Sequence, residues 1–105
     1  MLEITKDNFD ELVKESKKLV LVDYFSDGCE PCKALVPHIE ELGKIYGDRI
    51  EFYKFNTSKA RRLAIKEKVL GLPTITIYEN GEKKNELTKE DATKENIEKM
   101  ILKSL

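Results

Sequence analysis

The chain is 105 residues long, with 40% hydrophobic and 37% charged residues, which is the composition of one globular domain rather than of a disordered chain. Lysine and arginine total 19 against 20 acidic residues, and because the two signs alternate along the chain we expect no basic face and no binding to nucleic acid or membranes. No apolar run approaches the roughly 20 residues that span a bilayer. Residues 1–7 lack a signal or transit pattern, so we expect a cytoplasmic protein.

The first half of the chain predicts two helices around a buried strand. Residues 7–13 carry apolar side chains at helical spacing after a capping residue. Residues 19–25 form a near-continuous apolar run, typical of a central strand covered on both faces, in which Asp23 is the anomaly. Apolar residues then recur at helical spacing over 32–46, and Gly47 supplies a plausible stop.

A second strand and a third helix follow in the middle of the chain. Residues 50–55 alternate in the manner of a strand, with aromatic side chains gathered on its second face. Thr57 or Ser58 is expected to cap a helix whose apolar positions lie within residues 60–64. A strand followed at once by a helix extends the alternation seen in the first half.

The last third of the chain predicts a hairpin and a closing helix. Residues 74–78 are strongly strand-like, and the Asn-Gly pair at 80–81 is a good two-residue hairpin signal into a polar edge strand near 83–88. Apolar positions at helical spacing then mark an amphipathic helix that is capped near Thr93 and includes Leu105.

The order of these elements, with a short strand before the first helix, predicts the α/β class. Strands interleaved with helices require a mostly parallel sheet with helices on both faces, and the hairpin adds an antiparallel edge. No repeat or linker interrupts the pattern, so residues 1–105 are interpreted as one domain. The polar edge strand discourages pairing with another chain, and we therefore expect a monomer.

Two cysteines separated by two residues lie where the buried strand ends and the second helix begins. Open α/β sheets place their sites at this carboxyl end of the strands. If the helix starts at or just after Cys29, its free amide groups stabilise a thiolate there, which makes Cys29 the nucleophile. Cys32 comes round the first turn to lie deeper beside it, where it can resolve a mixed disulfide. Pro31 suits an early helical position.

Other uses of the cysteine pair fit the sequence less well. A structural zinc site needs about four ligands, and the chain offers two cysteines and one histidine, His38. Inert buried cysteines lie among apolar neighbours, whereas the glycine and proline around this pair indicate an exposed turn. We therefore expect no metal and no cofactor apart from a redox-active disulfide between Cys29 and Cys32.

Asp23 stands in an otherwise apolar strand, six residues before Cys29. Burial would raise the pKa of its carboxyl group, so that Asp23 can take a proton from Cys32 as that thiol attacks and return it in the reverse direction. The alternative is that Asp23 points to solvent at a strand edge. Lys54 is a candidate neighbour that would lower this pKa, although a lysine on a strand is usually just solvated.

These residues together resemble the thioredoxin family, and the resemblance covers essentially the whole chain. The matching features are the cysteine motif, a buried acid, a neighbouring lysine, a helix-kinking proline and a cis-proline, which correspond here to residues 29–33, Asp23, Lys54, Pro37 and Pro73. The resemblance implies a thioredoxin fold, with a central five-stranded mixed sheet flanked by four helices. It also implies a protein-disulfide reductase whose partners are thioredoxin reductase and disulfide-containing target proteins.

The resemblance also implies a docking surface around the disulfide. Pro73 should face the disulfide, keep metal from the thiols and offer backbone groups to an extended substrate strand. Its position just before the strand expected at 74–78 is one where proline is tolerated. The substrate-binding residues expected on this basis are Gly28, Glu30, Pro31, Leu70, Leu72, Pro73 and Thr74.

Three positions depart from the family pattern. Gly28 replaces the usual tryptophan, Glu30 replaces a glycine, and the glycine expected before the last helix is replaced around residues 90–91. Leu70 and Leu72 are expected to supply apolar contact instead. The Gly-Cys-x-Pro-Cys sequence also resembles the thioredoxins of amino-acid-fermenting anaerobic bacteria, which work beside glycine reductase systems. Components of such a system are therefore candidate partners.

The residues leave two main functions open, and a third, an oxidase or isomerase, depends on the reduction potential. In the first, the chain is a reductant that passes two electrons from a reductase to target proteins through Cys29 and Cys32. In the second, the fold is a redox-inactive or regulatory binding module for a partner protein. For the first function we add a hypothesis about Glu30: its negative charge beside Cys29 should disfavour the thiolate and make the disulfide harder to reduce.

Overall fold

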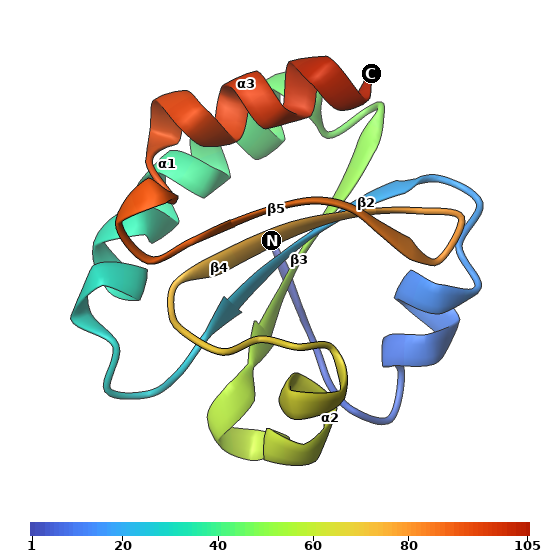
Figure 1. Cartoon of the computed structure of the whole chain (residues 1–105). Coiled ribbons are helices and arrows are strands. Elements are labelled where there is room, and N and C mark those ends of the chain that lie inside the picture. The colour runs from blue at the N-terminus through green and yellow to red at the C-terminus, as the bar shows by residue number, and fades with distance from the viewer.

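The computed structural model describes residues 1–105 and contains a five-stranded sheet in the order β1-β3-β2-β4-β5 (Figure 1). The central strand β2 is buried over all five of its inner residues, which confirms the expected central strand. β5, at one edge, is exposed over most of its length. The strands are β1 Leu2–Ile4, β2 Leu19–Phe25, β3 Ile50–Asn56, β4 Thr74–Glu79 and β5 Glu82–Thr88.

The sheet is mixed, because β1, β3 and β2 run parallel whereas β4 and β5 run antiparallel to their neighbours. The hairpin of β4 and β5 forms the expected antiparallel edge, and β4 runs antiparallel to the central β2 as well as to β5. Residues 57–73 connect β3 to β4, and β4 begins beside the end of β2, where Thr74 pairs with Tyr24. The chain therefore re-enters the sheet at the end where β3 leaves it.

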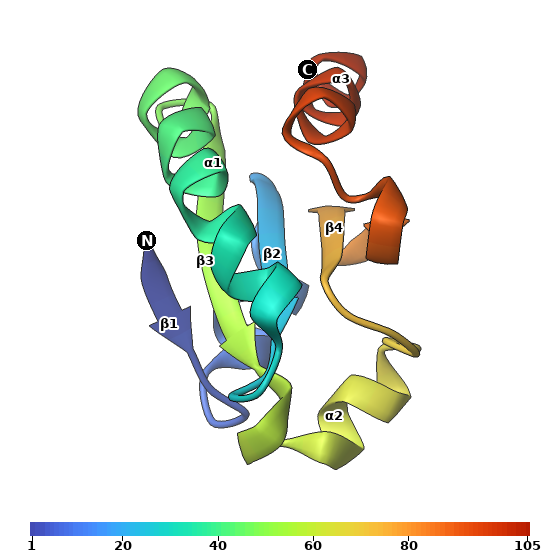
Figure 2. The same ribbon diagram turned by 90° about the vertical axis from the view of Figure 1, so that its left-hand side faces the viewer.

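Helices cover both faces of the sheet, as the alternation of elements predicts (Figure 2). The helices α1 and α3 pack on one face, and the π-helix η1 and the helix α2 lie on the other. No helix is both long enough and apolar enough to cross a membrane. The helical segments are η1 Asp10–Lys14, α1 Glu30–Tyr46, η2 Thr57–Lys59, α2 Arg61–Lys66, η3 Lys89–Asp91 and α3 Lys94–Ser104.

Two apolar cores follow from this layering, one on each face of the sheet. Twelve buried residues fill the space under α1 and α3, and nine fill the space on the side of η1 and α2. β2 contributes to both cores, with Leu21 in the first and Val20 and Val22 in the second. This double burial explains why the sequence of β2 is almost continuously apolar.

The cap expected for the third helix is wrong. Thr57 and Ser58 lie in the 3-10 turn η2, which Asn56 caps by accepting a hydrogen bond from the amide of Ser58 at 3.0 Å. Both hydroxyl groups are engaged elsewhere. Thr57 donates to the carbonyl of Phe25 at 2.9 Å, and Ser58 accepts from the amide of Asp27 at 3.1 Å. The helix α2 then begins without a side-chain cap.

The closing hairpin and helix form as predicted, with one exception. Asn80 and Gly81 have φ angles of 52° and 80°, the left-handed conformation that a tight hairpin turn requires. A side chain at Gly81 would also place its Cβ 2.1 Å from the carbonyl oxygen of Lys14. Thr93 caps α3 by accepting from the amide of Asn96 at 3.2 Å. Leu105, however, lies beyond the end of α3 and is 46% exposed.

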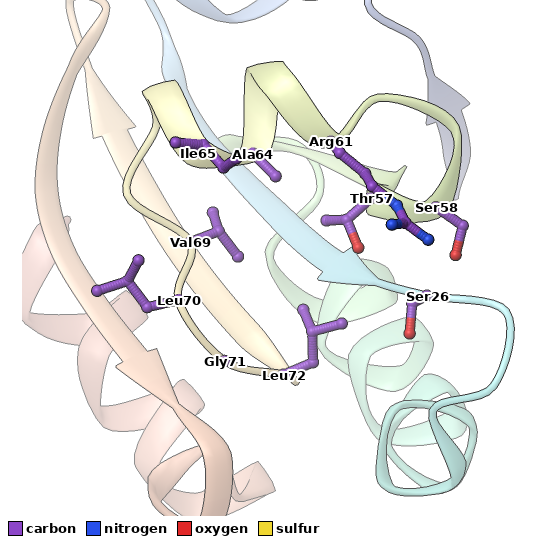
Figure 3. Close-up of a pocket in the computed structure, with 10 residues that line it drawn as sticks. All are labelled: Ser26, Thr57, Ser58, Arg61, Ala64, Ile65, Val69, Leu70, Gly71 and Leu72. Carbon is purple, nitrogen blue, oxygen red and sulfur yellow. The ribbon is translucent and has the colours of Figure 1, made fainter.

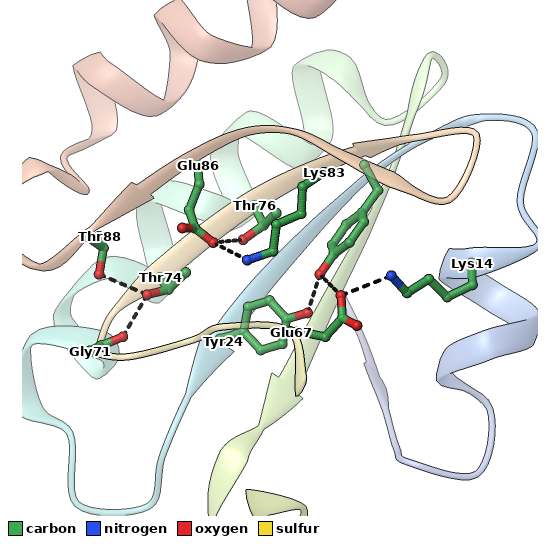
Figure 4. Close-up of polar contacts among 10 residues, drawn as sticks. Lys14, Tyr24, Glu67, Gly71, Thr74, Thr76, Lys83, Glu86 and Thr88 are labelled. Carbon is green, nitrogen blue, oxygen red and sulfur yellow. Dashed lines mark hydrogen bonds and ion pairs between the residues drawn. The ribbon is translucent and has the colours of Figure 1, made fainter. Parts of the chain in front are cut away.

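A buried chain of polar side chains joins η1, β2, β4 and the end of α2 (Figure 4). The hydroxyl oxygens of Tyr24 and Tyr78 lie 2.6 Å apart, and the Tyr78 hydroxyl donates to a carboxylate oxygen of Glu67 at 2.9 Å. The Nζ atom of Lys14 lies 3.1 Å from the same oxygen. Burial raises the pKa of both tyrosines, so that they remain neutral donors. These polar contacts therefore fix the end of α2 against the sheet.

Replacing Tyr78 with phenylalanine tests the contribution of these polar contacts to stability. Tyr78→Phe leaves the buried Tyr24 hydroxyl without its partner, so we expect the free energy of unfolding to fall by about 1 to 3 kcal/mol. Tyr53→Phe is the matched control, because Tyr53 is also buried but takes no part in these polar contacts. Urea denaturation of both variants measures the difference. An equal loss in the two variants would contradict the proposed contribution.

Candidate active site

The cysteine pair lies at the junction between the end of β2 and the first turn of α1. Cys29 is the N-cap of α1, and its Sγ atom accepts a hydrogen bond from the amide of Cys32 at 3.2 Å. A disulfide joins the two residues, whose Cα atoms are 5.2 Å apart. The expectation that the helix begins just after Cys29 and brings Cys32 round to it is confirmed.

The two cysteines differ in their exposure to solvent. Cys29 is half-buried, whereas only 2% of Cys32 is exposed. Free amide groups and the positive end of the helix dipole favour a thiolate at Cys29 once the disulfide is reduced. A partner can therefore reach Cys29 but not Cys32, which is the arrangement that thiol–disulfide exchange with a protein target requires.

The residues that flank the pair are exposed. A Cβ at Gly28 would have no heavy atom within 4 Å, so the space beside the disulfide is open where a family member usually has tryptophan. The side chain of Glu30 is 82% exposed, and one of its carboxylate oxygens lies 3.4 Å from the Nζ atom of Lys33. Pro31 occupies the first turn of α1, where its missing amide hydrogen costs nothing. These residues lie next to the cysteines in sequence and are exposed to solvent.

Asp23 is buried in the face of the sheet that α1 covers. Its side chain shares that face with Leu21, because alternate residues of a strand point the same way. Only 1% of Asp23 is exposed, and its Oδ1 atom has no hydrogen-bond partner. Burial raises the pKa of Asp23 to about 7, and the positive charge of Lys54 lowers it in part. The alternative that Asp23 points to solvent is therefore excluded.

A cavity of about 170 Å³ lies beside the buried Cys32. Cys32 from α1, Lys54 from β3 and Phe25 from the end of β2 all line it. Lys54 is the register partner of Asp23 on the neighbouring strand, so the two side chains lie on the same face of the sheet. A cavity of this size is large enough to hold water. Asp23 does not itself line the cavity, but its register partner Lys54 does.

The loop before β4 contains a cis peptide bond between Leu72 and Pro73. The amide and carbonyl groups of Leu72 form no backbone–backbone hydrogen bond, so they are free to pair with an extended strand. Pro73 differs from the expectation in this respect. It has no amide hydrogen, and its carbonyl already accepts from the amide of Lys89 at 2.7 Å. Leu72 rather than Pro73 therefore carries the free backbone groups of this loop.

Thr74 is not available to a partner, although it was expected on the docking surface. Only 1% of Thr74 is exposed, and its hydroxyl donates to the carbonyl of Gly71 at 2.6 Å (Figure 4). The same oxygen lies 2.9 Å from the hydroxyl of Thr88 on β5. Thr74 therefore holds the loop before β4 in place and does not contact a substrate.

A groove of about 570 Å³ lies between α2 and this loop (Figure 3). Leu70 and Leu72 both line it, which places the two predicted apolar contact residues together, and Leu70 is 87% exposed. Ser26 lies at the end of the groove nearest the cysteines, since its carbonyl accepts from the amide of Cys29 at 3.3 Å. The groove is therefore continuous with the neighbourhood of the disulfide.

Two contacts at this end of the sheet are not among those that the sequence predicts. The Nδ2 atom of Asn56 donates to a carboxylate oxygen of Asp27 at 2.9 Å, which ties the loop before the cysteines to the end of β3. Asn56 is a good capping residue at the end of a strand, and this was the available signal. The side chain of Lys89 lies over Gly71, where a Cβ would be 2.3 Å from the lysine Cε atom. No pattern in the sequence indicates the position of Lys89.

A closely spaced pair of cysteines that forms a disulfide at a helix N-terminus defines the site of a dithiol/disulfide oxidoreductase. The Thioredoxin family model matches residues 1–103. The chain is 60% identical over 103 residues to a thioredoxin of Peptoclostridium acidaminophilum, covering 98% of this chain and 94% of that protein. It is 59% identical to a thioredoxin of Acetoanaerobium sticklandii, covering 98% of each. A chloroplastic M-type thioredoxin of Pisum sativum is 38% identical over 82 residues, which are 78% of this chain and 48% of that protein.

The chain therefore belongs to the thioredoxin family. It is a protein dithiol/disulfide oxidoreductase with protein-disulfide reductase activity. Thioredoxins work without a bound cofactor, and the disulfide of Cys29 and Cys32 is itself the redox group. Membership of the family implies a thioredoxin reductase and disulfide-containing proteins as partners.

The buried carboxyl group predicts a pH-dependent stability. The pKa of Asp23 is about 7 in the folded chain against 3.8 for an aspartate fully exposed to water, so folding favours the protonated form. The stability of the oxidised protein should fall as the pH rises from about 4 to about 7 and stay level above that. One pKa unit corresponds to about 1.4 kcal/mol. The free energy of unfolding of Asp23→Asn, relative to that of the parent, should therefore be about 2 to 3 kcal/mol higher at pH ~8 than at pH ~5.

Urea denaturation of the oxidised proteins at the two pH values measures this difference. Asp48→Asn is the matched control, because Asp48 is an exposed carboxylate in the turn after α1. This control should show no such dependence. A gain for Asp23→Asn that is the same at both pH values would contradict the buried charge.

The charge beside Cys29 predicts the direction of a change in reduction potential. Removing the Glu30 carboxylate leaves the Cys29 thiolate more stable, so Glu30→Gly should have a less negative potential than the parent, by about 10 to 30 mV. The ion pair with Lys33 favours the lower end of this range. Glu30→Gln separates the effect of charge from that of backbone flexibility. Equilibration with glutathione measures the potentials, and an unchanged or more negative value in both variants would reject the hypothesis.

Proposed function

We propose that the chain is a thioredoxin that acts as a reductant, carrying two electrons from a reductase to disulfides of target proteins. The observation that carries this proposal is the unequal exposure of the two cysteines at the start of α1, with Cys29 accessible and Cys32 only 2% exposed. An accessible thiolate backed by a sheltered thiol suits a protein that attacks a target disulfide and then releases it. The name thioredoxin, borne by relatives 60% and 59% identical, supports the same direction.

In the proposed cycle, the Cys29 thiolate attacks one sulfur of the target disulfide and expels the other as a thiolate. A mixed disulfide between Cys29 and the target is formed. Cys32 then loses its proton and attacks the Cys29 sulfur, and the second target sulfur leaves as a thiolate. The target disulfide gains two electrons and, with two protons, becomes a dithiol, while the disulfide of Cys29 and Cys32 forms again.

We assign the proton transfer at Cys32 to Asp23. A group with a pKa of about 7 exists in both protonation states near neutral pH, which is what a reversible proton carrier needs. Water in the cavity lined by Cys32 and Lys54 is the proposed link between the thiol and the carboxyl group. Lys54 tunes Asp23 through its positive charge, since the two residues are register partners on neighbouring strands.

The target segment is proposed to lie beside the exposed motif residues and the loop before β4. Gly28, Glu30 and Pro31 form the surface next to Cys29. Leu72 offers free backbone groups for pairing with an extended strand, and Leu70 offers an exposed apolar side chain. This surface differs from that of most family members because it lacks the tryptophan that Gly28 replaces.

We further propose a monomer that works in the cytoplasm, a reducing compartment in which the cysteine pair can be returned to the dithiol. The polar and exposed edge strand β5 supports the monomer, because such edges resist pairing. Components of a glycine reductase system are proposed targets. The Gly-Cys-Glu-Pro-Cys sequence supports this assignment through its resemblance to thioredoxins that work beside such systems.

Substitution of each cysteine in turn tests the proposed cycle. With dithiothreitol as the electron donor, the parent should reduce a generic protein disulfide. Cys29→Ser should abolish turnover, because no thiolate can attack the target. Cys32→Ser should form the mixed disulfide but fail to resolve it, so that a covalent complex accumulates and disappears on addition of a reductant. Non-reducing electrophoresis detects this complex.

The same variants distinguish the reductant from a binding module that uses the fold to hold a partner. Capture of targets by Cys32→Ser should be lost when Cys29 is also replaced. Equal capture by a variant without either cysteine would favour the binding module and would contradict the exchange mechanism.

A further inference from the structure

The segment from the end of β3 to the loop before β4 has a charge unlike that of the whole chain. Residues 59–68 hold five lysine and arginine side chains and one carboxylate, Glu67, whereas the net charge of the chain is −1. Glu67 is 5% exposed and already paired with Lys14, and among the five cations only Lys59 forms an ion pair, with Glu3. The alternation of signs that predicted no basic face does not hold in this segment.

One of these cations, Arg61, lines the groove described above and is its only charged residue (Figure 3). Arg61 is exposed and takes part in none of the ion pairs of the structure. Figure 3 shows its guanidinium group on the same side of the groove as Thr57 and Ser58, with Ser26 below them and Leu70 on the far side. An unpaired cation therefore borders the part of the groove that leads to the disulfide.

We propose that Arg61 is a specificity-determining residue for target proteins, which it selects by pairing with a carboxylate near the attacked cysteine of the target. The proposal rests on the reductant function proposed above and adds a class of substrate to it. The groove supplies two kinds of contact, apolar contact from Leu70 and Leu72 and one positive charge without a counterion. A guanidinium group matches a carboxylate in shape and can bind it with two hydrogen bonds. An acidic target segment with an apolar side chain therefore complements the groove.

The lining of the groove favours a protein target over nucleic acid. Single-stranded nucleic acid is held by aromatic side chains that stack on bases and by several cations that follow the phosphates. None of the residues that line this groove is aromatic, and only Arg61 is charged. The other cations of residues 59–68 add to the local positive potential, which speeds the approach of an acidic surface.

The test uses two peptides that differ in one residue. Each has a single cysteine joined by a disulfide to an aromatic thiol whose release is visible by absorbance, and a leucine nearby. One peptide carries glutamate two residues from the cysteine and the other carries glutamine there. In the reaction the Cys29 thiolate bonds to the peptide sulfur and expels the aromatic thiolate. Cys32 then loses a proton and displaces the peptide thiolate, so the two electrons lost by the protein reduce the mixed disulfide.

The second-order rate constant of the pre-reduced parent should be about two- to fivefold higher for the glutamate peptide, the range that an exposed ion pair supports. This preference should weaken as the salt concentration rises. Arg61→Gln should bring the ratio of the two rate constants to about one, and Arg61→Lys should retain part of it. Arg62→Gln is the matched control, because it removes the same charge from the next residue, which does not line the groove. This control should keep the preference of the parent.

The outcomes separate this inference from the proposed function. Reduction of both peptides by the parent at equal rates would overturn the role of Arg61 and leave the reductant function standing. Failure of the parent to release the aromatic thiol from either peptide would contradict the reductant function itself. An equal loss of preference in Arg61→Gln and Arg62→Gln would overturn the assignment to Arg61. If a single-stranded oligonucleotide inhibits the parent but not Arg61→Gln, the groove would be assigned to nucleic acid instead.

Discussion

The site depends on the way the chain passes from the buried strand β2 into the helix α1. β2 is covered by apolar cores on both faces, so its end is held firmly, and α1 starts only five residues after Phe25. This short junction leaves Cys29 no position other than the N-cap and brings Cys32 one turn further into the protein. The difference in exposure between the two sulfur atoms, on which the exchange chemistry rests, is therefore a consequence of where the strand stops and the helix begins.

The same burial that stabilises β2 makes a charged carboxylate at Asp23 destabilising and raises its pKa into the neutral range. A carboxyl group without a hydrogen-bond partner on one of its oxygens destabilises the fold when it is charged, and its pKa shifts to about 7 as a result. A position with this cost would suit an apolar residue if stability were the only requirement. The nearby cavity, which Cys32 and Lys54 line, is where we propose that water links the buried acid to the thiol of Cys32 in the reduced protein.

The surface that we propose for partners includes, besides the residues around Cys29, the segment between β3 and β4. Its geometry is held from behind by the buried contacts of Tyr78 and Glu67 and from the side by Thr74 and the amide of Lys89. With these anchors in place, Leu72 presents free backbone groups, and the adjoining groove presents apolar side chains and one cation.

The sequence by itself determined the features that depend on near neighbours in the chain. These are the alternation of strands and helices, the cysteine pair at the start of a helix, the acid in an apolar run and the cap at Thr93, because each is decided within one strand or one helical turn. Only the tertiary structure decided the direction of β4, the cap at Asn56, the partner of the Pro73 carbonyl and the groove beside Arg61. Each of these depends on which distant segments meet, and such meetings are set by the length of connections and by the packing of whole elements, which no local pattern records.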